Sequence, residues 1–72
     1  MNKEELQKII GSRIKQLRES KGVTQQDLAE MCNFEKGNMS RLEAGRTNPT
    51  ITTIYKISQA LNVKIIDILD IE

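Results

Sequence analysis

The chain has 72 residues, of which 38% are hydrophobic and 29% are charged, and its net charge is +1. This length suits one domain with a small core. The chain contains no histidine, which removes the commonest general base and the commonest transition-metal ligand. No pair of carboxylates is spaced for acid–base catalysis, so we expect neither an enzyme nor a cofactor, and nothing in the pattern indicates a small-molecule substrate.

Cys32 is the single cysteine, so no disulfide can form within the chain, which suits a reducing cytosol. A small buried thiol is the simplest interpretation, and a reactive or intermolecular thiol is the alternative. No run of ~18 apolar residues could cross a membrane, and the first residues include acids where a secretory signal would carry bases. We therefore expect a cytoplasmic protein with no membrane partner.

The first predicted helix spans Lys3 to Ser20 and ends at Gly22, which suits a left-handed residue after a helix. Apolar residues recur in it at steps of three and four and form one stripe. The members of that stripe are Leu6, Ile9, Ile10, Ile14 and Leu17.

The second predicted helix covers about residues 25–32, with Thr24 as N-cap and Asp27 three residues later in a capping-box pattern. Asn33 ends it, because asparagine tolerates the left-handed conformation. Phe34 follows as a buried anchor in the turn. The inward face of this helix is predicted to contain Leu28, Ala29 and Cys32.

Three further helices are predicted, at residues 35–43, 51–61 and 65–69. The first ends at Ala44 and Gly45, the second begins at the N-cap Thr50, and the last has no good N-cap. Residues 46–49 form a polar loop. The helix predicted after this loop, at residues 51–61, has one apolar side. That side comprises Ile51, Ile54, Ile57, Ala60 and Leu61. With no strand pattern and short connections, the chain is predicted to be all-α, a compact five-helix bundle.

The helix at residues 35–43 has two unlike faces when residues are placed at 100° steps. Met39, Leu42 and Glu43 share one side and are expected to point inward. The opposite side is small, positive and able to donate hydrogen bonds. It consists of Lys36, Gly37, Ser40, Arg41 and Ala44.

Two short helices joined by a tight turn, the second with such a face, describe a helix-turn-helix at about residues 24–44. Its second helix would enter the major groove of DNA, where Arg41 could bind guanine O6 and N7 and Lys36 could bind a base or a phosphate. Residues 13–46 also hold seven bases and five acids. Spacing alone leaves open that this segment is simply an exposed helix.

Three blocks of sequence are similar to one known family: IGSRIKQLRESKGVTQQDLAE at residues 10–30, MSRLEAGRTNPTITTIYKISQAL at 39–61 and VKIIDIL at 63–69. Together they resemble the Cro and phage-repressor (Xre-type) helix-turn-helix regulators over nearly the whole chain. The resemblance implies a lambda-repressor-like DNA-binding domain, spanning residues 1–72 as one domain, from a bacterial or phage-type protein.

The resemblance also implies roles for particular residues. Base-reading positions of the family fall on Lys36, Gly37 and Arg41, with Ser40 beside them, although Gly37 offers no side chain. Contacts to the DNA backbone are implied for the start of the second helix and for the loop after the third, and we add Asn38 to this group. The expected backbone contacts are Thr24, Gln25, Asn38, Arg46, Thr47 and Asn48.

An internal ion pair between the first and third helices is a further implication of the family, and Arg18 and Glu43 occupy its positions. The inward direction of Glu43 supports the pairing, since a buried carboxylate without a partner would be costly.

These observations favour a sequence-specific DNA-binding regulator, in the form of a repressor that binds a palindromic operator as a homodimer on double-stranded DNA. Ile65 to Ile71 contain more apolar residues than one short helix can bury, so this segment is either a dimer interface or core with a frayed end. The alternative function is a protein-interaction module, such as an antitoxin or bridging factor, whose helix-turn-helix does not read DNA.

Overall fold

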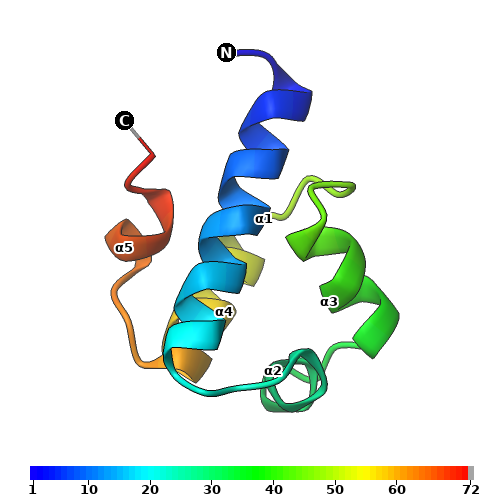
Figure 1. Ribbon diagram of the computed structural model, residues 1–72, viewed down its shortest axis with the longest axis vertical. Helices are drawn as coiled ribbons and strands as arrows, with labels where there is room; N and C mark the ends of the chain where they lie inside the picture. Colours follow the sequence, from blue (N-terminus) through cyan, green and yellow to red (C-terminus); the bar gives the residue numbers. More distant parts are fainter. Residues whose placement is uncertain (72) are drawn as a thin grey trace.

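The computed structural model describes residues 1–71 and contains five α-helices within them. The long helix α1 occupies the centre, α2 and α3 lie on one side of it, α4 lies behind it, and α5 lies on the side away from α3 (Figure 1). The helices are α1 (Lys3–Ser20), α2 (Gln25–Met31), α3 (Lys36–Glu43), α4 (Ile51–Leu61) and α5 (Ile65–Leu69). The all-α fold class is therefore confirmed.

Local chemistry explains where most helices begin. The Thr24 hydroxyl accepts a hydrogen bond from the backbone N–H of Asp27 (3.0 Å), and Thr50 does the same for Thr53 (3.2 Å). The start of α5, for which no good N-cap was expected, is capped in the reverse direction: the Asp67 carboxylate accepts from the backbone N–H of Lys64 at 2.9 Å. Helix α3 begins at Glu35 without any side-chain cap.

Left-handed residues end the helices where the sequence indicated them. Gly22 and Gly45 have φ of 69° and 77°, and Asn33 has φ of 58°. Asn62, the C-cap of α4, is also left-handed, with φ of 55°. Helix α2 stops at Met31, one residue earlier than predicted, because Cys32 already serves as its C-cap.

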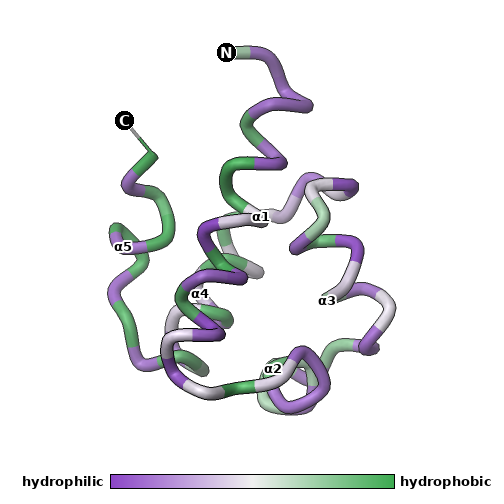
Figure 2. The backbone as a smooth tube through the Cα atoms, viewed as in Figure 1, coloured by the Kyte–Doolittle hydropathy of each residue, from purple (hydrophilic) through white to green (hydrophobic). Residues whose placement is uncertain are grey.

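One cluster of buried apolar side chains joins all five helices. The tube coloured by hydropathy shows α5 as mainly apolar and α3 as mixed (Figure 2). The buried cluster contains Ile14, Leu28, Ala29, Cys32, Met39, Leu42, Ile54, Ile57, Leu61 and Ile68.

Three predicted core residues lie nearer the surface than expected. Ile51 is 63% exposed and Leu6 is 37% exposed. Both belong to the first turns of their helices, and in Figure 1 the start of α1 extends beyond the neighbouring helices. A helical side chain leans toward the N-terminus of its helix, which carries these two past the edge of the core. Phe34 is only half-buried, and the Lys56 ammonium lies 5.9 Å from its ring centre.

Candidate nucleic-acid interface

The outward face of α3 is exposed as the helical spacing predicted. Met39, Leu42 and Glu43 are buried on the inner side. The opposite side is a continuous strip of exposed residues on a helix that packs against α1 and α2, and we call it the α3 face. It comprises Lys36, Gly37, Ser40, Arg41 and Ala44. A strip that is cationic and nearly free of bulky side chains allows a helix to approach a polyanion closely.

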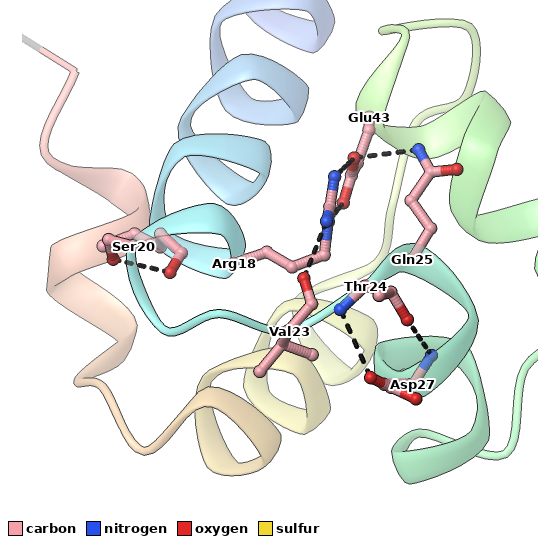
Figure 3. A network of polar contacts seen from close by, with 8 residues as sticks. Arg18, Ser20, Val23, Thr24, Gln25, Asp27 and Glu43 are labelled. Carbon is pink, nitrogen blue, oxygen red and sulfur yellow. Dashed lines mark hydrogen bonds and ion pairs between the residues drawn. The ribbon is translucent and has the colours of Figure 1, made fainter.

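A buried ion pair fixes the inner side of α3 to α1 (Figure 3). Nε of Arg18 lies 2.6 Å from Oε2 of Glu43, and Nη2 lies 3.0 Å from Oε1, so the guanidinium binds the carboxylate with two parallel bonds. Nη1 of Arg18 donates to the carbonyl of Val23 at 2.7 Å. The bond to Glu43 raises the pKa of Arg18 above its ordinary value, with burial opposing it. The predicted ion pair is thus present.

Gln25 connects this ion pair to the start of α2. Its Nε2 donates to Oε1 of Glu43 at 2.9 Å, as Figure 3 shows. One N–H and the oxygen of the amide are then available for another partner. Helices α1, α2 and α3 therefore meet at the single carboxylate of Glu43, and the orientation of Gln25 depends on it.

Two groups of predicted contact residues lie at opposite ends of α3. Thr24 and Gln25 line an open depression together with Lys36 at the start of α3. Arg46 and Asn48 are exposed in the loop that follows the end of α3, while Thr47 is half-buried. The structure therefore brings Thr24 and Gln25 beside Lys36, and a second open depression is lined by Thr47 and Asn48 of the loop together with Asn38 of α3.

Asn38 is exposed, but its side chain is already engaged. Its Oδ1 accepts a hydrogen bond from Nη2 of Arg41, one turn further along α3. Gly37 lies beside this contact: a methyl group added there would meet only Nη1 of Arg41, at 3.5 Å.

Gly11 is a positioning residue that the sequence reasoning did not single out. A methyl group on Gly11 would lie 2.4 Å from the carbonyl oxygen of Leu42 and 2.7 Å from that of Glu43. Helix α1 therefore touches the backbone at the end of α3 directly. The available signal was a glycine inside an 18-residue helix, a position that costs stability unless another backbone approaches closely.

Gly45 makes a second close contact with α1. A methyl group on it would lie 2.6 Å from Cα of Lys8, and its carbonyl accepts from Nε2 of Gln7 at 3.2 Å. The end of α3 is thus held by backbone contacts at Gly11 and Gly45 and by the Arg18–Glu43 pair.

Within residues 1–71, none of the helices is both long and apolar enough to cross a lipid bilayer.

Comparisons with known proteins agree with this geometry. A family model described as helix-turn-helix matches residues 14–68. The HTH-type transcriptional regulator y4dJ of Sinorhizobium fredii is 37% identical over 65 residues, which cover 90% of this chain and 84% of the relative. The HTH-type transcriptional regulator SinR of Bacillus subtilis is 40% identical, over 86% of this chain and 57% of SinR.

Solved structures show the same fold. The clp gene regulator ClgR from Corynebacterium glutamicum superposes with a TM-score of 0.88 at 31% identity, covering 90% of this chain and 84% of ClgR. SinR in complex with DNA superposes with a TM-score of 0.78 at 40% identity, covering 85% of this chain and 98% of that one. This chain belongs to the helix-turn-helix family of transcriptional regulators, and its relatives place it in the Cro and phage-repressor (Xre) type.

Proposed function

We propose that this protein is a sequence-specific DNA-binding transcriptional regulator that inserts α3 into the major groove. The observation that carries the proposal is the exposed α3 face on a helix whose opposite side is fixed by a buried ion pair. A helix anchored in this way can present side chains to base edges in one orientation. The structure of the relative SinR in complex with DNA supports this use of the fold over a protein-interaction module.

The contacts divide into two kinds in this proposal. Arg41 donates to a guanine, and Lys36 and Ser40 contact neighbouring base edges or phosphates. Backbone contacts come from the depression at the start of α3 and from the loop at its end, and they fix the register of the protein on DNA. The residues proposed for the backbone are Thr24, Gln25, Arg46, Thr47 and Asn48.

A homodimer on a palindromic operator is the second part of the proposal. Two copies of α3 would then lie about 34 Å apart, one helical turn of DNA. Ile66 is 65% exposed and Leu69 is 37% exposed on α5, on the side of α1 away from α3. If a second copy of the chain packs against these apolar side chains, the α3 faces of both copies remain free to bind DNA. Repression would follow from occupation of a promoter, in the cytoplasm of a bacterium or a phage host.

In vitro selection of bound DNA tests the proposal directly. We expect a palindromic motif to be enriched at low salt, and affinity for it to fall steeply as salt rises, because counterions are released from DNA on binding. Sedimentation equilibrium tests the dimer, with Ile66→Asp expected to shift the protein toward monomer. Failure to enrich any motif at low salt would exclude the proposed function.

A further inference from the structure

The Arg41 side chain is folded back along α3 and is held there. Its Nη2 donates to Oδ1 of Asn38, and its Nη1 passes 3.5 Å from the place where a methyl group on Gly37 would lie. Helical side chains lean toward the N-terminus, so residue 41 naturally covers the turn that contains residues 37 and 38. Both polar partners are exposed, so their contact is a property of the α3 face and does not hold the core together.

We propose that Asn38 is a positioning residue that presents the Arg41 guanidinium to a base edge, and that it is not a contact to the DNA backbone. This inference rests on the proposed function and assigns the specificity of the α3 face to a pair of residues. A free arginine loses rotamer freedom when it binds. A guanidinium that is already held loses less, which favours the bound state.

The contact with Asn38 leaves enough N–H groups of the Arg41 guanidinium to bind a base. A guanidinium has five N–H groups, and Asn38 uses one of them on Nη2. The remaining donors include those of Nη1, which lies 3.5 Å from the place where a methyl group on Gly37 would be. Two of the remaining donors can therefore bind O6 and N7 of guanine while the amide holds the third.

The charge of Arg41 also stays available. The amide of Asn38 is neutral, so it orients the cation without cancelling its attraction to DNA. Among residues 1–71, the ion pair joins Arg18 to Glu43 and does not involve Arg41. An aspartate at residue 38 would hold the guanidinium more strongly but would add repulsion from the phosphates.

Gly37 lies beside this arrangement but is not required by it. Only the edge of the Arg41 guanidinium approaches its missing side chain, at ordinary contact distance. An alanine would also fit at residue 37, so the contact between Arg41 and Asn38 does not depend on the glycine.

The test compares base discrimination among variants. After selection with the wild type, Arg41→Ala identifies the base pair whose preference is lost. We expect Asn38→Ala to reduce discrimination at that same base pair about fivefold and to leave the other positions unchanged. Asn38→Asp should retain the discrimination while weakening binding to all sequences. Gln59→Ala removes an exposed amide from α4 and serves as the control.

A double substitution separates the two roles of Asn38. If it acts through Arg41, adding Asn38→Ala to Arg41→Ala should change affinity less than twofold. If it binds a phosphate, the double variant should lose affinity uniformly on every sequence, and that result would overturn the inference. Loss of one base preference in Arg41→Ala but not in Asn38→Ala would also overturn it, while the proposed function would stand.

A measurement without DNA completes the test. In ¹⁵N spectra of the guanidinium groups at low temperature, Nη1 and Nη2 of Arg41 should give separate signals in the wild type because Asn38 slows their exchange. In Asn38→Ala they should merge, with melting temperature unchanged. Merged signals in the wild type would contradict the inference independently of any DNA result, whereas absence of a selected motif would count against the proposed function itself.

Discussion

Arg18 of α1 and Glu43 of α3 are 25 residues apart in the chain, yet their side chains form a two-bond ion pair with Nε–Oε2 at 2.6 Å. Both residues are only 7% exposed. The pair attaches the end of α3 to α1 and orients Gln25 through the shared carboxylate. The position of the α3 face relative to the rest of the domain therefore depends on this contact.

Removing one partner of the pair should be costly. We expect Arg18→Ala to lower the free energy of unfolding by about 3–5 kcal/mol, because Glu43 would remain as a buried charge without its partner. The total free energy of unfolding of a small domain is only about 5–15 kcal/mol. Urea denaturation with a circular dichroism readout measures the change. An unaltered midpoint would show that the pair does not stabilise the fold.

Replacing both partners provides the control. Arg18→Met combined with Glu43→Leu should cost much less than Arg18→Ala, because no unpaired charge is then buried.

The pKa of Arg18 is raised by Glu43 in the folded state, so the contribution of Arg18 to stability is fully present below its unfolded pKa. The stability difference between the wild type and Arg18→Ala should therefore stay constant as pH rises from about 7 to about 9.

Gly11→Ala should destabilise the domain although alanine is the better helix former. The added methyl group would lie 2.4 Å from the Leu42 carbonyl, so α3 must move away from α1. Such overpacking typically costs about 1–3 kcal/mol. Thermal or urea unfolding measures it, and Ser12→Ala on the exposed side of the same helix is the control. A gain in stability would show that α1 and α3 are not in direct backbone contact.

Gly37→Ala is the same chemical change with the opposite expected sign. The methyl group meets only Arg41 Nη1 at 3.5 Å, and Gly37 is exposed. Stability should rise by about 0.5–1 kcal/mol, as for a glycine replaced in a helix. The selected DNA motif should be unchanged, because the guanidinium keeps its place. A changed motif would mean that the backbone at Gly37 itself must approach the bases.

Arg46→Ala should weaken binding to all sequences equally. Arg46 is exposed in the loop after α3 and is proposed to contact phosphate. The slope of log K against log salt should fall in magnitude by about 1 for each protomer. Fluorescence anisotropy at several salt concentrations measures the slope. Lys64→Ala, at the start of α5, should leave it unchanged, and an equal effect of both variants would indicate a general charge effect.

Cys32 should be protected from alkylation. It is 5% exposed, and burial raises the pKa of its thiol, while the charge of Lys56 acts in the opposite direction. Because the thiolate is the reactive form, native protein at pH ~8 should react with iodoacetamide on the order of 100-fold more slowly than unfolded protein. Mass spectrometry measures both rates. Equal rates would show that the thiol is accessible and would favour the reactive alternative.

Much of the fold could be predicted because it follows from local rules. Helix starts at Thr24 and Thr50 follow from hydroxyl capping, and helix ends at Gly22 and Gly45 follow from left-handed residues. The two faces of α3 follow from helical spacing, and exposure agrees with them residue by residue. The partly wrong expectations concern Ile51, Leu6 and Phe34, whose exposure depends on where the core ends.

The sequence by itself determined the helices, the outward face of α3 and the family, since each depends on residue order alone. Only the tertiary structure decided how α3 is held. Gly11 lies against α3 because two helices distant in sequence cross there. Helical spacing already makes Asn38 and Arg41 neighbours on α3, and the structure adds the rotamer of Arg41 that joins them. Periodicity places residues on a face, but it contains no information about which backbones of different helices touch or which side chains of different helices bind each other.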